Sequence, residues 1–492
     1  MSVLNLSDFG GGLNLRAAPS ELAVNESPAC LNVTLDERGG VVKRLGLSRL
    51  NTSDGAATGY LNLYFSPVLG YYLIQDGTGL YKTTDFNTLT LLKTFSTSDR
   101  VGMCDFATKA IIAHPVDGVF SYDGAAFSTI STSVKGSCCA AWQNRIWVGG
   151  DPTNPPLLTF GAQGISDSTT FTAAGAGTNQ VREIDSQIIT ALEVTSYLLV
   201  YKDSSTYRVT DPNSGNYASL SAVAGASGNL ASVVLGKTFA SMNGQGIWVT
   251  DGVRIPVNVG EKLKPLFDSA QINFAKLGLI AAGRTQNRLV FSFPYGAAAT
   301  LNNRTLEYHP REGWIVPHSF GCSAFTNLTT GNFKLYGADP TKKNVYEVFK
   351  TGADNGAAIA ASFQTPWIAP RPGYKSRHMR LDLRKRGAFS LFVKSDFDTG
   401  QGRLFAVPAA SSGITWDGGH TWDDGSVWAQ INYEDLLPLY PYALAEAVSF
   451  VLNESSTISA SAPALLGDGA SAEVGAFALY GIGIDSVPAG ER

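Results

Sequence analysis

The chain has 492 residues, of which 44% are apolar and 16% are charged, and its formal net charge at pH 7 is −4. This apolar content excludes a disordered chain and is enough for about two to four domains, each with its own hydrophobic core. The weakly acidic balance also excludes a chain that is basic throughout, which tight DNA binding by charge neutralisation would require.

The glycine content indicates the fold class, and the cysteine content indicates which kinds of site to expect. The 52 glycines, together with many Ser, Thr, Asn and Asp residues, are typical of short strands joined by tight turns. We therefore predict an all-β fold. The five cysteines show no C-x-x-C spacing, so we predict neither a disulfide framework nor a metal site, and no cofactor. No apolar run approaches the roughly 18 residues of a membrane helix, so no membrane span is expected.

Residues 1–50 form the first predicted segment, and its glycines and prolines determine which backbone conformations it can adopt. Three glycines at 10–12 remove side-chain limits on the backbone, and Pro19 and Pro28 disfavour helix before them. We predict an extended arm that lies along its own domain or a neighbouring subunit and leads into a strand near residues 41–42; a flexible leader without a role is the alternative. The residues predicted to form its interface are Phe9, Leu13, Leu15 and Pro28.

Four short motifs of this segment together match a known pattern. They are Phe9-Gly10-Gly11-Gly12-Leu13-Asn14-Leu15, Asn25-Glu26-Ser27-Pro28, Asn32-Val33 and Lys43-Arg44-Leu45-Gly46. In residue type and spacing together, they resemble the opening of bacteriophage tail proteins, in particular the nozzle (tail tubular protein B) class of short-tailed phages. The resemblance implies a ring-forming virion protein in which a terminal β-sandwich follows a β-propeller.

A loose repeat follows the arm, from about residue 56 to residue 350. In each unit, an apolar strand is followed by a Gly, Asp or Asn turn, such as Asp123-Gly124 or Asp251-Gly252, and by a second strand with aromatic residues. Repeats of about forty to fifty residues with about four strands are typical of β-propellers, since one small sheet cannot bury both of its faces alone. We predict a propeller of about six or seven blades over residues 51–355; a chain of β-sandwiches is the alternative for part of this region.

Two segments interrupt the repeat, residues 161–180 and 212–228. Both are rich in small residues and poor in charge. We predict extended surface loops at both places, either packed against a neighbouring subunit or flexible.

The pattern changes after a small-residue linker at residues 355–361. Apolar runs continue with different spacing to the end of the chain, and we predict a separate C-terminal β-sandwich over residues 356–492. Its predicted strands are 362–367, 379–383, 389–393, 447–452 and 474–484.

The strongest charge cluster lies inside this predicted sandwich, at residues 371–386. It could contact the DNA backbone or an acidic face of a partner ring, and a solvated strand pair is the alternative. Tyr374 is its one aromatic residue, so a base-stacking platform is not supported. The candidate contact residues to a subunit, a partner or DNA are Arg371, Lys375, Arg377, Arg380, Arg384, Lys385 and Arg386.

Residues 415–422 read Thr-Trp-Asp-Gly-Gly-His-Thr-Trp and fit the Asp-box pattern of sialidase-like propellers. The pattern describes a hairpin turn in which the Asp accepts backbone N–H bonds and glycines adopt positive φ. Trp416, Trp422 and Trp428 follow at intervals of six and could stack on sugars. A structural turn is our main interpretation, and a glycan site is the alternative. The chain shows no H-E-x-x-H, G-x-S-x-G, P-loop or dinucleotide motif, so we predict that it is not an enzyme.

Together these features predict a structural tail protein of the phage virion, assembled in the cytoplasm of the host bacterium. The resemblance implies a homo-oligomeric ring, a hexamer, that extends the DNA channel below the portal and adaptor, retains the genome and conducts it during ejection. Its expected partners are the adaptor (head-tail connector) ring, tail fibres or a tail tip, and double-stranded DNA in transient, non-specific passage. The alternative is a glycan-binding or glycan-cleaving propeller, such as a tail-associated depolymerase. A protein-interaction propeller of cellular origin is a third reading.

Overall fold

The structure is a computed structural model of the chain. It describes residues 2–36, 39–52, 54–329, 333–369, 376–386, 389–395, 403–407, 435–439, 443–445, 448–453 and 478–488. Its contacts divide the chain into two compact units: the first joins residues 1–47, 311–319 and 349–492, and the second contains residues 48–310 and 320–348. The predicted division had three parts, at 1–50, 51–355 and 356–492. Here the N-terminal and C-terminal segments belong to the same unit.

The second unit consists mainly of short antiparallel strands in sequence order. Five sheets lie wholly within it, and each has four strands that pair in the order of the chain. The first two sheets contain Asn62–Ser66 (β8), Tyr71–Asp76 (β9), Gly79–Thr83 (β10), Thr90–Thr94 (β11), Gly102–Phe106 (β12), Lys109–His114 (β13), Gly118–Tyr122 (β14) and Phe127–Ser131 (β15). The next three contain Cys138–Trp142 (β16), Arg145–Gly149 (β17), Leu157–Phe160 (β18), Gly177–Gln180 (β19), Ala191–Val194 (β20), Leu198–Tyr201 (β21), Thr206–Val209 (β22), Tyr217–Ser221 (β23), Ser232–Leu235 (β24), Thr238–Asn243 (β25), Gly246–Thr250 (β26) and Val257–Asn258 (β27).

Two more groups of strands complete this unit, and we call them the sixth and seventh sheets. Two 3-10 helices, Glu261–Phe267 (η1) and Phe274–Leu279 (η2), precede them. The strands are Ala281–Arg284 (β28), Leu289–Phe293 (β29) and Arg304–His309 (β30), followed by Ala324–Leu328 (β32), Lys334–Ala338 (β33) and Val345–Thr351 (β34).

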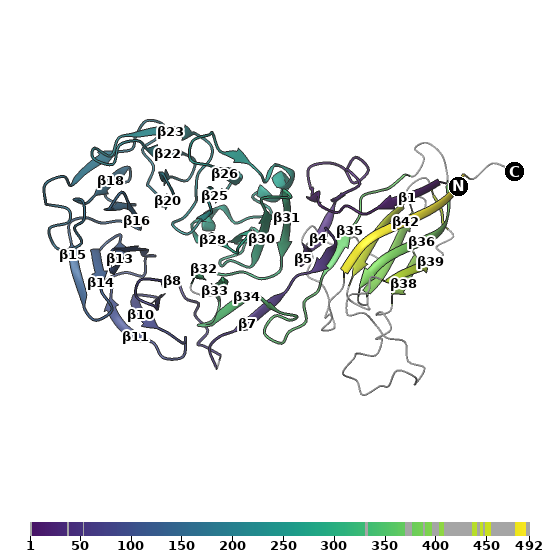
Figure 1. Ribbon diagram of the computed structural model, residues 1–492, viewed down its shortest axis with the longest axis horizontal. Helices are drawn as coiled ribbons and strands as arrows, with labels where there is room; N and C mark the ends of the chain where they lie inside the picture. Colours follow the sequence, from purple (N-terminus) through teal and green to yellow (C-terminus); the bar gives the residue numbers. More distant parts are fainter. Residues whose placement is uncertain are drawn as a thin grey trace, which may run out of the picture. The chain divides into compact units, whose positions relative to one another are not determined.

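The sheets of the second unit form a ring (Figure 1). The first strand of each sheet lies next to the first strand of the following sheet, in the order β8, β12, β16, β20, β24, β28 and β32, and β32 lies next to β8. At this closure, the Phe65 N–H donates to the Thr326 hydroxyl (2.8 Å) and the Leu50 N–H donates to the Val345 carbonyl (2.9 Å). The all-β class and the propeller-like arrangement of four-stranded sheets are confirmed.

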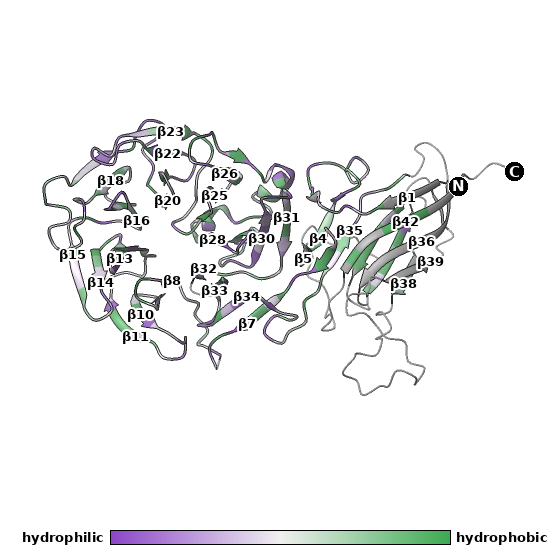
Figure 2. Ribbon diagram, in the orientation of Figure 1, coloured by the Kyte–Doolittle hydropathy of each residue, from purple (hydrophilic) through white to green (hydrophobic). Residues whose placement is uncertain are grey.

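Apolar side chains fill the space between neighbouring sheets. One buried cluster joins Leu73 of the first sheet to Phe120 of the second. Another closes the ring, because Tyr72 of the first sheet packs on Tyr336 of the seventh, with ring centroids 5.7 Å apart. In Figure 2, strands such as β14 contain an apolar stretch. Each sheet therefore buries its faces only with the help of its neighbours.

Aspartates fix several turns that lead to an outermost strand. The carboxylates of Asp85, Asp123 and Asp251 each accept hydrogen bonds of 2.7–3.0 Å from the N–H groups two and three residues further on. These backbone hydrogen bonds hold the pKa of all three carboxyls below the usual range. Gly124 and Gly252 follow with φ of 97° and 84°, which favours glycine. The predicted Asp-Gly turns are confirmed at both places.

The two predicted insertions are more ordered than surface loops. Residues 161–180 contain β19, and residues 212–228 contain β23, the fourth strands of the third and fourth sheets. Arg145 is 6% exposed and binds both segments, since its guanidinium donates to the carbonyls of Gly161 (2.9 Å) and Gly175 (2.7 Å) and to the side chain of Asn213 (2.9 Å).

The first unit combines strands from both ends of the chain. A seven-stranded sheet has the order β39-β36-β42-β6-β5, with β1 on β42 and β40 on β36, and a five-stranded sheet has the order β38-β37-β41-β35-β4. Their strands are Ser2–Leu6 (β1), Ala29–Leu31 (β4), Val33–Leu35 (β5), Val41–Lys43 (β6), Ser362–Gln364 (β35), Ser376–Arg386 (β36), Phe389–Ser395 (β37), Arg403–Val407 (β38), Asp435–Leu439 (β39), Ala443–Ala445 (β40), Val448–Asn453 (β41) and Ala478–Pro488 (β42). Four further short strands are Gly12–Leu13 (β2), Glu26–Ser27 (β3), Gly46–Arg49 (β7) and Trp314–His318 (β31). The N-terminal segment is therefore woven into sheets and is not a free arm.

Ring closure yields the first testable prediction. The buried Asn344 side chain accepts hydrogen bonds from the Asn51 amide (2.8 Å) and the Gly55 N–H (2.9 Å). We expect Asn344→Ala to lower the free energy of unfolding of the second unit by about 2 kcal/mol, because it removes the acceptor that both hydrogen bonds share. Urea unfolding measures this loss. The exposed Asn287→Ala is the control and should change it by less than about 0.5 kcal/mol; equal effects would contradict the role of Asn344 in closure.

Candidate functional site

The predicted interface residues of the N-terminal segment lie at different depths. Phe9 and Leu13 are each 1% exposed, and the Phe9 ring meets Phe363 edge-on with centroids 5.8 Å apart. Leu15 and Pro28 are half-buried. Phe9 and Leu13 are thus core residues of their own unit, whereas Leu15 and Pro28 are partly exposed to solvent.

The glycines of the first motif allow close backbone contacts. The Gly11 N–H donates to the Asn25 carbonyl at 2.9 Å, and a Cβ at Gly11 would lie only 2.7 Å from that oxygen. Gly12 has a φ of 70°, and a Cβ there would lie 2.8 Å from the Trp314 ring. A larger residue at either position would require the neighbouring chain to move.

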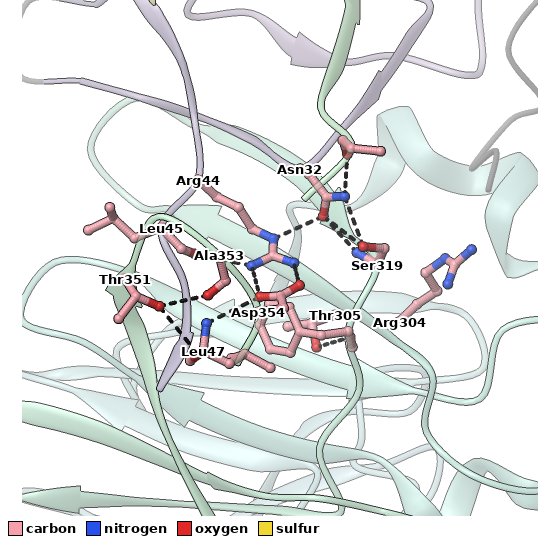
Figure 3. A network of polar contacts seen from close by, with 12 residues as sticks. Asn32, Arg44, Leu45, Leu47, Arg304, Thr305, Ser319, Thr351, Ala353 and Asp354 are labelled. Carbon is pink, nitrogen blue, oxygen red and sulfur yellow. Dashed lines mark hydrogen bonds and ion pairs between the residues drawn. The ribbon is translucent and has the colours of Figure 1, made fainter. Parts of the chain in front are cut away.

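Asn32 and Arg44, from two of the other motifs, lie at the centre of a buried polar network (Figure 3). The Arg44 guanidinium binds Asp354 through two N–H groups, at 2.9 and 2.5 Å, and donates through Nε to Asn32 at 2.9 Å. The Asn32 amide donates to the Ser319 hydroxyl (2.8 Å) and to the Ala360 carbonyl (2.6 Å). The network therefore joins the segment of Asn32 and Arg44 to two later segments of the first unit, through bonds that span 287, 310 and 328 residues of the chain.

The backbone around this network is equally constrained. Asn32 adopts a φ of 56°, a left-handed conformation that asparagine tolerates better than most residues. The Leu47 N–H donates to the Asp354 carboxylate at 3.1 Å, and a Cβ at Gly46 would lie 2.2 Å from the Ala353 carbonyl. In the Lys-Arg-Leu-Gly motif, the arginine is thus a buried cation, and the glycine allows two backbone segments to approach closely.

The network holds segments together and has no evident reactive group. Arg44 is 1% exposed, and its ion pair with Asp354 is bidentate, the strongest geometry for a guanidinium and a carboxylate. A buried ion pair adds little net stability, but removing one partner is strongly destabilising because it leaves a buried charge unpaired. We interpret the site as a positioning device for the first unit.

The basic cluster is only partly described. Five of its members, Arg377, Arg380, Arg384, Lys385 and Arg386, lie on β36, which pairs with β42 on one edge and with β39 and β40 on the other. They therefore occupy an interior strand of the seven-stranded sheet. Arg371, Lys375 and the predicted Asp box with Trp416, Trp422 and Trp428 lie outside the described residues.

The centre of the ring contains an arginine that the sequence analysis missed. Arg100 precedes β12, and its guanidinium donates to the carbonyls of Gly278 (3.3 Å), Leu279 (3.4 Å) and Ser323 (3.0 Å), which precede β28 and β32. Burial lowers the pKa of this guanidinium to about 10, so it remains protonated at neutral pH. One side chain of the second sheet thus reaches the sixth and seventh sheets.

An asparagine adds a second connection at the same end of the first strands. The Asn229 amide, which precedes β24, donates to the carbonyls of Val101 (3.4 Å) and Ser137 (3.1 Å), which precede β12 and β16. A B-DNA duplex, whose major groove alone is about 12 Å wide, cannot pass between groups that single side chains connect. The centre of the ring is closed to DNA at this end.

A partly buried acid lies further along the first strands. Burial raises the pKa of the Glu193 carboxyl on β20 to about 7, although a hydrogen bond from the Ser232 hydroxyl (2.8 Å) and the charge of Arg284 oppose the shift. The Tyr201 hydroxyl is buried without a hydrogen-bond partner in the described part of the chain, and its pKa is raised by burial and by Glu193. No sequence motif marks Arg100 or Glu193, because each is a single charged residue in or before an ordinary strand.

Within the described residues, no group of three or more His, Cys, Asp or Glu side chains is placed to hold a metal ion. The helices in that part of the chain include none long and apolar enough to cross a membrane.

No protein-family model and no curated protein matches this chain. Among solved structures, it is similar to the computationally designed Ika8 protein, with a TM-score of 0.35, 10% identity, and coverage of 61% of this chain and 99% of that one. It is also similar to the N-terminal domain of Nup159, with a TM-score of 0.35, 11% identity, and coverage of 65% and 100%. Likenesses at this level carry no argument about function.

The Arg44 network can be tested by removing one or both charges. We expect Arg44→Met to lower the free energy of unfolding of the first unit by about 3 kcal/mol, because the Asp354 carboxylate, whose side chain is only 24% exposed, loses its counter-ion. The double variant Arg44→Met/Asp354→Leu should recover more than half of that loss. Thermal unfolding and limited proteolysis provide the measurement. Arg49→Met, which breaks a more exposed ion pair with Asp54, is the control and should cost less than about 1 kcal/mol.

Glu193 should make the stability of the second unit depend on pH. Its pKa rises from 4.5 in the unfolded chain to about 7 in the fold, so the unfolded state loses its proton first as pH rises. The stabilisation present below pH 4.5 is therefore lost progressively up to about pH 7, by at most about 3 kcal/mol. Glu193→Gln lacks this loss, so its stability relative to the wild type should be greater at pH 8 than at pH 5. Urea unfolding at both pH values provides the measurement; parallel pH profiles would contradict the assignment.

Proposed function

We propose that this chain is a subunit of the tail nozzle of a short-tailed bacteriophage, a structural protein of the virion assembled in the host bacterial cytoplasm. The resemblance of the N-terminal motifs carries the proposal. Their contacts support it, because Gly12, Asn32, Arg44 and Gly46 occupy places that a larger or less polar residue would not fit. A motif built from such residues is expected to mark a shared arrangement of the first unit.

The proposal includes a finer architecture. We infer that the seven sheets of the second unit are the blades of a seven-bladed β-propeller, and that the two sheets of the first unit form a β-sandwich. The order of the first strands around the ring supports the blades. The mixture of N-terminal and C-terminal strands in both sheets supports a single sandwich domain.

The DNA channel in this proposal lies between copies of the chain. Arg100 and Asn229 close the centre of the ring at one end, so a conduit requires several subunits, six by family resemblance. A net charge of −4 suits such a wall, because DNA slides past a surface that offers few cations. The adaptor ring and the fibres or tail tip would bind at the two ends of the assembly.

The second candidate function is binding of bacterial surface glycans. The Trp416–Trp428 segment that suggested it lies outside the described residues. A cavity in the second unit provides independent support and is considered below.

Assembly and its dependence on the basic cluster can be tested by native mass measurement. The chain should form closed multimers, alone or on its adaptor ring. The variant Arg384→Gln/Lys385→Gln/Arg386→Gln should bind about tenfold more weakly at low salt and show a smaller salt dependence, because charged contacts between subunits are lost.

The control removes three exposed cations from the second unit instead: Lys237→Gln/Arg254→Gln/Lys276→Gln. It should assemble like the wild type. A chain that stays monomeric both alone and with the adaptor ring would refute the nozzle assignment, and equal weakening of the two variants would remove the basic cluster from the interface.

A further inference from the structure

A cavity of about 370 Å³ lies between the third and fourth sheets of the second unit, within the range of about 300–1,000 Å³ that small-ligand pockets occupy. Its walls come from the turn after β16, the turn after β20 and the end of β22. No acidic residue is among them in the described part of the chain. The polar and aromatic lining residues are Trp142, Gln143, Ser196, Tyr197, Arg208 and Thr210.

The walls are held in place by the protein itself. The Trp142 indole N–H donates to the Ser196 carbonyl at 3.4 Å and so joins the two turns. Gln143 and Asn144 both adopt positive φ, 51° and 56°, in a tight turn, and the Asn144 carbonyl accepts the Gly164 N–H at 2.8 Å. The Gln143 side chain is therefore carried on a turn with a fixed backbone.

Among the described residues, the cavity contains one cation, and none of them supplies its counter-ion. The Arg208 guanidinium lies over the Tyr197 ring, 5.2 Å from its centroid, and donates one hydrogen bond to the Gly252 carbonyl at 3.3 Å. It forms no ion pair with any described carboxylate. The neighbouring Asp211 accepts the Asn213 N–H at 2.9 Å within its own turn and does not line the cavity. Stacking thus orients Arg208, while most of its N–H donors have no acceptor within the described part of the chain.

We propose that this cavity binds a carboxylate-bearing saccharide unit, of the uronic acid type. The guanidinium pairs with the sugar carboxylate, the geometry in which arginine binds most strongly. The Gln143 amide and the Ser196 and Thr210 hydroxyls supply donors and acceptors for the ring hydroxyls. An acidic peptide fits less well, because Val209 and Pro212 are the only aliphatic wall residues that the described part of the chain provides. The proposal goes beyond the nozzle function and does not depend on assembly.

Calorimetric titration of the full chain with sodium D-galacturonate and with its trimer tests the site. We expect saturable binding of the trimer and none of a neutral glucose trimer. Arg208→Gln should weaken binding at least about tenfold, equivalent to about 1.4 kcal/mol. Gln143→Gly should also weaken it, and glycine keeps the positive φ that the turn requires, so this second variant tests the site even if Arg208→Gln fails to fold.

The matched control is Arg254→Gln, which removes an exposed cation whose side chain is 88% accessible and does not line the cavity. It should bind the trimer like the wild type. Three results would overturn the proposal: no saturable binding at millimolar galacturonate trimer, tighter binding of a glutamate tripeptide than of the saccharide, or binding that both cavity variants leave unchanged.

Discussion

The second unit depends on one constraint: a four-stranded sheet with two apolar faces is stable only between two neighbours. Six contacts between successive sheets would leave the outer faces of the first and last sheets in water, and the seventh contact removes both exposed faces. That contact is made by Tyr72 and Tyr336 within the core and by Asn51 and Asn344 beside it. Ring closure is therefore not a local feature of one sheet, because the same contact covers a face of the first sheet and a face of the last.

The first unit solves a different problem, since its strands come from opposite ends of the chain. Hydrophobic contacts alone specify the pairing of such distant strands weakly, because many apolar strands could exchange places. Arg44 is more selective: it is fully bonded only when Asp354 and Asn32 are both in position. The resulting network adds little net stability, and we interpret its value as specificity for one pairing of distant segments.

Local features could be predicted from the sequence, whereas long-range ones could not. The all-β class, the Asp-Gly turns and strands such as β13, β14 and β37 follow from residue pattern within a few positions. The strands β19 and β23 escaped prediction because they are outer edges with polar residues such as Thr178 and Asn179, which carry no apolar alternation. The partners of Asn32 lie 287 and 328 residues away, and no local pattern contains that information. The same holds for Arg100 and Arg208, whose structural roles depend on contacts with elements distant in the chain.

The position of Arg100 also decides where function can lie on this ring. A side chain that connects the second sheet to the sixth and seventh at the axis leaves the outer turns and the spaces between sheets as the available surfaces. The Arg208 cavity occupies such a space, and it needs no open axis. A conduit between several copies needs none either, because each ring then serves as a rigid wall element. The closed centre thus favours functions in which the ring acts by its outer surface, and this holds for both proposals made here.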